Sequence, residues 1–563
     1  MPLPRRPRCR RSQPRALSKK LSEKALLPVT TLAASALLVW LALPTVWQTP
    51  LNVDEELTLR LADFSFRNIF HIVSSERGGG PFHFWLEHFL LGWWPGLPAL
   101  RVPSLVFLCL ALPAVGLLVR RLAGREAAAG VVLLTAVSPI PVMYATFGRP
   151  HTLLFAWLMW STVLVLRAAE DGDRRLWVAG GALLGLSVFV HPTAPLYALT
   201  AFGVALVYAP RDPRTVAREA WPGAVALLVT FVPYYVKTLH VLSDRYGVGS
   251  GARSGRTFSG RPVWEDALHF VAPGRHDVNY FTVLAAVGVI ALVVRRSYRV
   301  LAVCALTVAS PVVFFSVIPA SGDSALFFDR YMIPVTPAFL VVVLTGCLTI
   351  ARWAGRLRFA VLVLLVAGLA VIEVRYDLNH RRDVAGIHVD RVVAAVASQP
   401  RGAVLFGSTG TTGAFFSSFD YGHPANILDH LVALRVPSVD LVDDDSCERA
   451  QPFLAGSQEP RYGVWLFYDA TTRRPFRGVP NVVASQLGGY VVVRSADRLA
   501  PRALIRLGIR LRLVWRRAVP QNRRVDELLI ADRQVLAGRC VPYGDLGDPD
   551  ISPHWPPVKT VHQ

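Results

Sequence analysis

Long apolar runs, separated by short basic segments, dominate the first two thirds of the chain. The first run extends from Ala25 to about Trp47, and comparable runs recur as far as about Asp377. Because a helix needs about 20 apolar residues to cross roughly 30 Å of hydrocarbon, each run predicts a membrane span. About eleven such spans result, so the fold class that we predict is an α-helical polytopic membrane protein.

Arginine clusters occupy alternate gaps between the apolar runs. Positively charged residues favour the cytoplasmic side of a membrane, so these clusters mark the inner face. The outer face then receives residues 48–100, 148–151, about 240–276 and 321–330. The clusters are Arg120, Arg121 and Arg125; Arg167, Arg174 and Arg175; Arg211, Arg214 and Arg218; Arg295, Arg296 and Arg299; and Arg352, Arg356 and Arg358.

This topology divides the chain into three parts. Residues 1–24 form a basic cytoplasmic tail, and residues 25–378 form a transmembrane module whose outer loop covers residues 48–100. The run that starts at Ala25 is longer than the apolar core of a cleaved signal peptide, so we expect a retained first span. An odd number of spans then places residues 379–563 outside the membrane, where about 185 residues suffice for a separate domain.

The last third of the chain has the pattern of a small α/β domain. Residues Val389–Ser398 have helical periodicity, whereas Gly402–Phe406, Tyr462–Tyr468 and Gly489–Arg494 have the pattern of strands. The secondary structure of the Arg-rich segment Ala500–Arg517 stays open, since both a period of two and a helical stripe fit it. Either form suits an anionic lipid surface or a solvated basic face.

The composition agrees with a protein of the plasma membrane. Of the residues, 53% are hydrophobic and only 18% are charged. The net charge of +21 lies between the apolar runs rather than on one compact basic domain, so we expect membrane lipids as partners and no nucleic acid. The cysteines lack the spacing of a zinc site. Cys447 and Cys540 are the two for which a disulfide is conceivable.

A carboxylate cluster, Asp54-Glu55-Glu56, follows the first predicted span directly. After it come an amphipathic stretch, Leu57–Ile72, a glycine-rich turn at residues 78–81, and the apolar stretch Phe82–Trp94, which is short for a span. These two stretches predict helices that lie along the outer membrane surface. Carboxylates in such a loop are either ordinary solvated residues or parts of a site.

Further motifs follow in a definite order along the chain. They are LRVPS at residues 100–104, RRLAGR at 120–125, Ser138-Pro139, Gly148-Arg149-Pro150-His151, and FDRYMIP at 328–334. Together with the carboxylates after the first span, this series resembles the membrane glycosyltransferases of the GT-C superfamily. The branch of protein O-mannosyltransferases and lipid A aminoarabinose transferases is the most similar, over about residues 25–380.

The resemblance implies an inverting transfer of a sugar from a polyprenyl-phosphate donor to an envelope glycan, lipid or protein. Asp54 would be the base that deprotonates the acceptor hydroxyl, with Glu55 assisting. The departing phosphate needs cations, and arginine binds phosphate oxygens in a bidentate manner. The mechanism needs no cofactor.

Cationic and aromatic residues at the predicted outer ends of spans are the candidates for the donor phosphate. Arg330, with Tyr331 beside it, comes first and Arg149 second, followed by Lys237 and Arg245. The alternative for Arg330 is a snorkelling side chain or a partner for its acidic neighbour. His83 and His151 are further candidates, although a single histidine at an interface is more often a hydrogen-bonding residue.

Gly148 departs from the family pattern, because many relatives carry an acidic residue at this position. We therefore expect no metal site at this turn. Two rival functions stay open. A transporter or binding protein for lipid-linked saccharides would also need many spans and basic phosphate contacts, but it would place polar residues near the bilayer midplane. An inactive relative that only binds glycans is the other rival.

Overall fold

The computed structural model describes the helical part of the chain and five strands. The described residues are 14–48, 55, 58, 61–62, 64–77, 79–94, 97–246, 263–271, 277–317, 329–385, 403–408, 438–440, 461–467, 482–487 and 490–495. Asp54, Cys447, Cys540, Val389–Ser398 and Ala500–Arg517 fall outside them, so the expectations for these positions stay predictions.

Helices account for nearly all of the described residues before residue 386. In chain order they are α1 (Pro14–Gln48), α3 (Phe66–Ile72), the π-helical turn η1 (Val73–Arg77), α4 (Pro81–Trp93), α5 (Leu97–Ala123), α6 (Arg125–Val137), α7 (Pro139–Ala145), α8 (His151–Asp171), α9 (Arg174–Leu186), the 3-10 turn η2 (Ser187–Phe189), α10 (Ala194–Tyr208), α11 (Pro213–Tyr246), α12 (Val263–Val271), α13 (Asp277–Val294), α14 (Tyr298–Val317), the 3-10 segment η3 (Asp329–Val335), α15 (Thr336–Trp353), the 3-10 turn η4 (Gly355–Leu357) and α16 (Arg358–Ala385).

The helices confirm a polytopic membrane protein. Seven are long and apolar enough to cross a bilayer, and the pair α6–α7, bent by 55°, makes an eighth. The apolar helices α10 and α13 are shorter, as is α9 with its 13 residues. With these three included, the helices follow the predicted order of about eleven apolar runs. Helices are present in both stretches for which surface helices were predicted, as α3 within Leu57–Ile72 and as α4 over nearly all of Phe82–Trp94.

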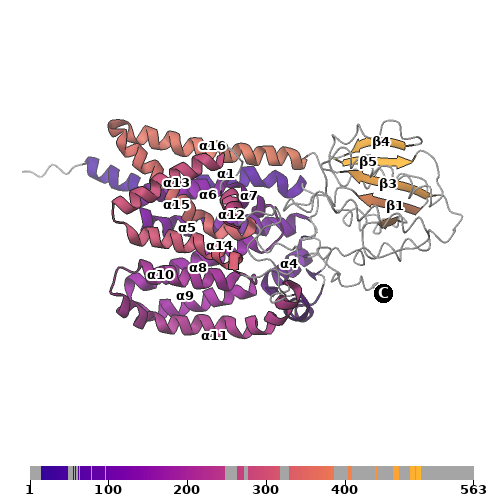
Figure 1. Cartoon of the computed structure of the whole chain (residues 1–563), viewed down its shortest axis with the longest axis horizontal. Coiled ribbons are helices and arrows are strands. Elements are labelled where there is room, and N and C mark those ends of the chain that lie inside the picture. Colours follow the sequence, from indigo (N-terminus) through magenta and orange to yellow (C-terminus); the bar gives the residue numbers. More distant parts are fainter. Residues whose placement is uncertain are drawn as a thin grey trace, which may run out of the picture.

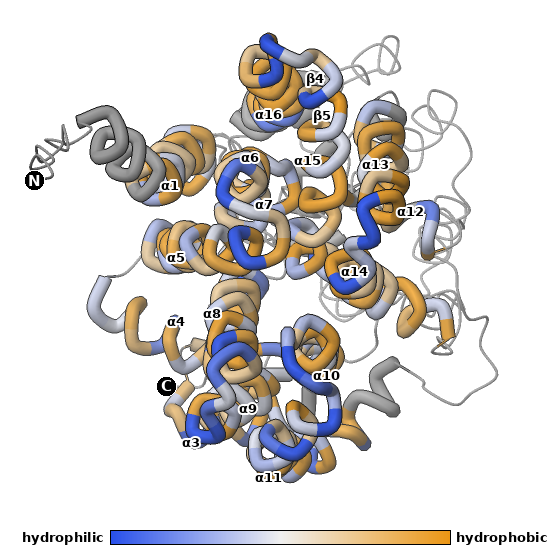
Figure 2. The backbone as a smooth tube through the Cα atoms, turned by 90° about the vertical axis from the view of Figure 1, so that its left-hand side faces the viewer, coloured by the Kyte–Doolittle hydropathy of each residue, from blue (hydrophilic) through white to orange (hydrophobic). Residues whose placement is uncertain are grey.

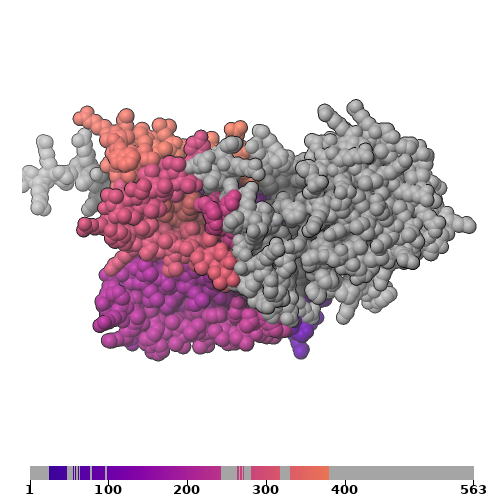
Figure 3. All heavy atoms as spheres, viewed as in Figure 1, coloured from indigo at the N-terminus to yellow at the C-terminus, as the bar shows by residue number. Residues whose placement is uncertain are grey.

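The spans form two groups, which Figure 2 shows end-on. One group contains α9 to α11, the other contains α1, α5 to α7 and α13 to α16, and α8 joins them, since it packs against α5 as well as α9. Figure 3 shows atoms of both groups as two blocks on one face. Glycines allow close contact within each group, since a Cβ at Gly223 or Gly346 would overlap the backbone of Trp177 or Leu284. Such small residues are typical of helix contacts in membranes.

The two ends of the bundle differ in character. The arginine clusters predicted for the inner face lie at the α5–α6, α8–α9, α10–α11, α13–α14 and α15–α16 connections. The surface helix α4 lies toward the opposite end of the bundle (Figure 1). The turn between α7 and α8 and the segment η3 belong to connections on this opposite side of the spans. The candidate site is built from these connections.

Five strands near the C-terminus form one mixed sheet. They are β1 (Ala403–Ser408), β2 (Ser438–Asp440), β3 (Arg461–Phe467), β4 (Val482–Leu487) and β5 (Tyr490–Ser495). Their order is β2-β1-β3-β5-β4, with parallel pairs on both sides of β1 and antiparallel pairs on both sides of β5. The three predicted strands correspond to β1, β3 and β5. The tight β4–β5 hairpin, which leaves only residues 488–489 between its strands, adds a strand that the sequence pattern did not indicate.

Candidate functional site

A buried ion pair fixes the segment that follows α1. Glu55 and Arg101 are 1% and 0% exposed. The Arg101 Nε and Nη2 atoms donate to the two oxygens of the Glu55 carboxylate at 2.8 and 2.6 Å. Arg101 Nη1 also donates to the carbonyl of Val46 at the end of α1, at 3.1 Å. Both Glu55 and the end of α1 are therefore tied to the start of α5.

The same carboxylate reaches the turn between α7 and α8. Glu55 Oε1 accepts a hydrogen bond from the backbone N–H of Gly148 at 2.7 Å. Ser104, one turn beyond Arg101 on α5, donates its hydroxyl to the Phe147 carbonyl at 2.7 Å. The turn is thus held by the arginine and the serine of the LRVPS motif, the first through Glu55 and the second directly.

Gly148 has no room for a side chain. A Cβ at this position would overlap the side chain of Leu100, the first residue of LRVPS. Its carbonyl faces the hydroxyl of Thr58 at 3.3 Å and Nε2 of His83 at 3.2 Å. Many relatives carry an acidic residue at this position. Here the Leu100 side chain occupies the space that such a residue would need, which gives the glycine a local packing reason.

His83 and Glu87 form a second buried pair on α4. His83 Nδ1 lies 3.8 Å from Glu87 Oε1, and both side chains are almost completely buried. Burial and the nearby charge of Arg149 lower the pKa of His83 to about 3. Burial and the charge of Glu55 raise the pKa of Glu87 to about 9. Near neutral pH the pair is therefore an uncharged imidazole beside a protonated carboxyl group.

Two arginines from distant parts of the chain converge on His151. Arg149 lies two residues before His151 in the chain, and Arg330 is connected to His151 through the rings of Tyr331 and His191. Arg149 Nη1 also lies 3.5 Å from the Thr58 hydroxyl. The Arg330 guanidinium carbon lies 5.7 Å from the ring centre of Tyr331. The first and second candidates for the donor phosphate therefore share one cationic region with His151.

Aromatic rings hold this cationic region in place. Tyr331 stacks on Phe315 at 4.7 Å between ring centres and lies 6.2 Å from His191. The His191 ring in turn lies 5.2 Å from His151. The Tyr331 backbone carbonyl accepts a hydrogen bond from the Tyr197 hydroxyl at 2.6 Å. Segment η3 is thus anchored to α10 and α14, and Arg330 is placed by packing.

The other residues predicted for the site, Lys237, Arg245 and Asp54, are not seen in contact with the cationic region around His151. The exposed Lys237 places its ammonium group over the ring of Phe70, 4.6 Å from the centre, and the other two are not among the residues whose side chains the structure describes. Sequence reasoning did not assign roles to Arg101, Ser104, Thr58 or Glu87. For Arg101 and Ser104 the signal was present, since both belong to the LRVPS motif.

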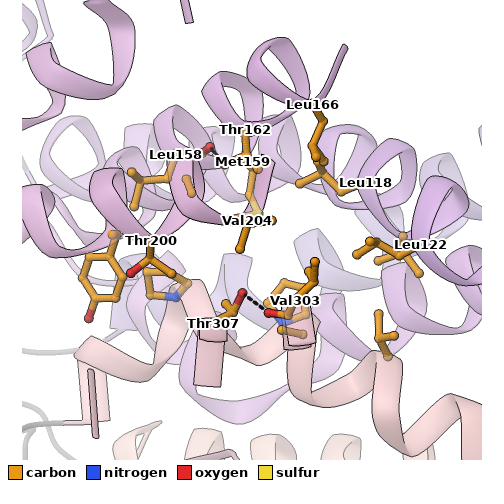
Figure 4. A pocket seen from close by; sticks show the side chains of 17 residues that line it. Leu118, Leu122, Leu158, Met159, Thr162, Leu166, Thr200, Val204, Val303 and Thr307 are labelled. Atoms are coloured by element: carbon orange, nitrogen blue, oxygen red, sulfur yellow. Dashed lines mark hydrogen bonds between the residues drawn. The ribbon is translucent and has the colours of Figure 1, made fainter. Parts of the chain in front are cut away.

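An apolar cavity of about 80 Å³ lies between the spans α5, α8, α10, α14 and α15 (Figure 4). The hydroxyls of Thr162, Thr200 and Thr307 in its wall donate to backbone carbonyls of their own helices, so its surface is almost entirely apolar. Tyr197, whose hydroxyl binds the backbone of Tyr331, is part of the same wall. The cavity therefore reaches the segment that carries Arg330.

Residues 80–236 match the family model described as dolichyl-phosphate-mannose-protein mannosyltransferase. The resemblance to membrane glycosyltransferases of the GT-C superfamily is thereby confirmed. The matched stretch begins just before α4 and ends within α11, so it contains His83, Arg149 and His151 and stops before Arg330. None of the curated proteins compared with the chain matches it.

Two solved structures resemble the chain in three dimensions. ArnT from Cupriavidus metallidurans bound to undecaprenyl phosphate is 15% identical, with a TM-score of 0.48 over 82% of this chain and 97% of that chain. The archaeal oligosaccharyltransferase AglB from Archaeoglobus fulgidus, in complex with an inhibitory peptide and a dolichol-phosphate, is 12% identical, with a TM-score of 0.45 over 80% of this chain and 74% of that chain. We assign no substrate from either likeness.

Proposed function

We propose that the chain is an inverting glycosyltransferase that moves a sugar from a polyprenyl-phosphate donor to an envelope acceptor at the outer face of the membrane. The observation that carries this proposal is the arrangement of Arg149 and Arg330 around the rings of His151, His191 and Tyr331, beside the turn that Glu55 holds. Two cations next to carboxylates match the demands of a transfer in which a phosphate departs and a hydroxyl loses its proton.

The two arginines supply the phosphate contact in this proposal. A phosphate oxygen accepts hydrogen bonds from guanidinium groups, which stay charged at every physiological pH. Burial of the surroundings strengthens the attraction, because water screens the charges less. His83 and His151 lie in the same region, and the low pKa of His83 keeps its imidazole neutral, so it adds no further positive charge.

Asp54 is the proposed base, and Glu55 assists by holding the backbone beside it. The Glu55 carboxylate is occupied by Arg101 and by the Gly148 N–H. A carboxylate in a buried bidentate ion pair is a poor proton acceptor, because protonation would leave the guanidinium without its partner. The adjacent Asp54 is therefore the better candidate for the acceptor proton, and a single displacement by the activated hydroxyl inverts the anomeric carbon.

The apolar cavity of about 80 Å³ offers a place for only the first isoprenoid carbons of the donor, because it is far smaller than a whole polyprenyl chain. Isoprenoid carbons gain free energy when they leave water for an apolar lining, and the cavity wall includes Tyr197, which contacts the η3 segment. A donor whose phosphate lies between Arg149 and Arg330 would then direct its chain between α10 and α14. Lys237 and Arg245 are proposed only as secondary contacts, at the end of α11.

The proposal is tested by comparing Asp54→Asn with the wild-type protein in membrane vesicles that contain radiolabelled polyprenyl-phosphate sugars. The variant should lose transfer of label to acceptors while its thermal unfolding temperature stays unchanged. Asp171→Asn, at an exposed carboxylate paired with Arg167, is the matched control and should keep full transfer. Undiminished transfer by Asp54→Asn would exclude this mechanism.

A further inference from the structure

Two carboxyl groups lie inside the bundle on the last span, away from the site described above. Glu373 and Asp377 are 0% and 8% exposed and lie one helical turn apart on α16. Residue 373 comes five positions before Leu378, where this span ends, which places it about 7.5 Å from the end along the helix axis. Ionisable residues at such depth are costly and usually have a function.

The carboxyl groups are incompletely paired within the described structure. Glu373 Oε1 accepts a hydrogen bond from the Ser138 hydroxyl at 3.1 Å. Glu373 Oε2 and Asp377 Oδ2 are buried and have no hydrogen-bond partner among the described residues. A buried polar atom without a partner loses its hydration and gains nothing in return. Two such atoms on one helix face indicate a ligand between α16 and the helices that cover it.

Helices α15, α6, α1 and α7 pack against α16, and Figure 1 shows α1, α6 and α7 below it. The α6–α7 pair is bent by 55° at Ser138. Pro139 and Pro141 lack backbone N–H groups, so the carbonyls of Thr135 and Val137, four residues earlier, lose their regular helical donors. The break therefore leaves backbone oxygens of α6 next to Ser138, the residue whose hydroxyl contacts Glu373.

A small pocket adjoins Asp377 on the same side. It has a volume of about 20 Å³ and is lined by residues of α1, α7 and α16, among them Thr45, Thr146 and Asp377. This volume holds about one water-sized occupant. The Thr146 hydroxyl donates its proton to the Met143 carbonyl at 2.8 Å, so its lone pairs are left to face a ligand. The polar atoms in and beside the pocket are thus mainly oxygen acceptors.

We propose that Glu373, Asp377 and the oxygens of the α6–α7 break form a binding site for a divalent cation that prefers oxygen ligands, of the Ca²⁺ type. Two carboxylates neutralise one divalent ion, and hydroxyl and carbonyl oxygens complete its shell. Ca²⁺ suits such a set better than Mg²⁺, because it tolerates irregular geometry. Among the described residues, no three His, Cys, Asp or Glu side chains are clustered so that they could hold a metal ion. Neutral oxygens must therefore complete the coordination of a cation bound by Glu373 and Asp377.

A bound cation would fix the angle between α6 and α7. Helix α7 leads directly to the turn that carries Gly148 and Arg149, and Thr146 belongs both to the pocket and to the end of this helix. The cation would therefore hold the helix on which the turn rests, without touching the reacting groups. This role does not depend on the chemistry of the proposed function.

The test uses the full-length protein in lipid nanodiscs, stripped with EDTA and titrated with CaCl₂, while thermal unfolding and the number of bound ions are measured. The proposal predicts that Ca²⁺ raises the unfolding temperature. Glu373→Gln and Asp377→Asn should each remove this rise, and the double variant should bind one ion fewer per chain than the wild-type protein. Glu126→Gln, at an exposed carboxylate on α6, is the matched control and should keep the full response.

The ion count separates this site from others on the chain, such as the acidic run Asp443-Asp444-Asp445. If the double variant keeps both the ion count and the temperature rise, the cation binds elsewhere and the proposal is wrong. The proposal is also wrong if Ca²⁺ does not change the unfolding temperature of the wild-type protein and the double variant is at least as stable as the wild-type protein. The two carboxyl groups would then be neutral acids. MgCl₂ and NaCl at matched ionic strength should give a smaller rise.

Discussion

The carboxylate of Glu55 is held by the guanidinium of Arg101 through two hydrogen bonds of 2.8 and 2.6 Å, with both side chains buried. This pair joins the segment after the first span to α5, and the Gly148 N–H extends it to the turn before α8. Three segments that are far apart in the sequence are thereby fixed against one another. The candidate site rests on this junction.

Arg101→Gln should destabilise the protein strongly. Removal of one partner leaves the Glu55 carboxylate buried and uncompensated, which costs about 3–5 kcal/mol. Arg167→Gln removes a largely exposed partner of Asp171, where the loss should stay below about 1 kcal/mol. Chemical unfolding of both variants in detergent micelles provides the measurement. Equal losses for the two variants would show that the buried pair does not hold the junction.

Substitution of the converging arginines should weaken donor binding selectively. Arg149→Gln and Arg330→Gln each remove charge-assisted hydrogen bonds to phosphate, worth about 1.5–3 kcal/mol or roughly a 10- to 100-fold rise in KM for the lipid donor. Lys237→Ala should change KM less than about twofold, since its ammonium group is exposed over Phe70. Steady-state transfer kinetics with varied donor provide the comparison. A larger effect at Lys237 than at Arg330 would move the phosphate site to the end of α11.

The Glu87 carboxyl predicts a loss of stability at alkaline pH. Its pKa is raised from 4.5 to about 9 in the folded protein, so between these values the folded state keeps a proton that the unfolded chain releases. Stability contributed by this group therefore falls as the pH rises toward 9. The lowered pKa of His83 acts only below about 6.5, where stability falls as the pH falls.

The effect of Glu87 is isolated by unfolding measurements between pH 6.5 and 9. Glu87→Gln is uncharged throughout and should flatten the decline that the wild-type protein shows in this range. Glu126→Gln, at an exposed position, should leave the decline as it is. A Glu87→Gln variant with the wild-type pH profile would show that the carboxyl is not protonated in the folded state.

The spans and their order could be predicted from the sequence, because lipid imposes long apolar runs and the arginine clusters punctuate them. Arg149 and Arg330 were singled out because each belongs to a motif of the family that the sequence resembles. No apolar or polar periodicity along the chain indicated that they would lie in the same region. The partners of Glu55 could not be predicted in this way. Arg101 lies 46 positions away, and its contact with Glu55 depends on how α1 and α5 pack.

Gly148 shows a different limit of sequence reasoning. As a replacement for an acidic residue it led us to expect no metal site at this turn and left an inactive relative open, and both stay predictions. The structure adds a packing reason for glycine that the sequence did not show, because a Cβ here would overlap the Leu100 side chain. Glu87 was overlooked because a single acidic residue in an apolar stretch at the membrane surface, here Phe82–Trp94, normally faces water. Its burial follows from the packing of α4 against the turn before α8, where His83 contacts the Gly148 carbonyl.

The central claim is that the Glu55–Arg149 region faces the exterior, and cysteine labelling tests it most directly. Arg67→Cys on α3 and Arg174→Cys at the start of α9 place exposed thiols at the two ends of the bundle, in a chain whose native cysteines are replaced. A membrane-impermeant maleimide should label Arg67→Cys in intact cells and Arg174→Cys only after permeabilisation. The reverse pattern would place the carboxylates on the cytoplasmic side and contradict the account.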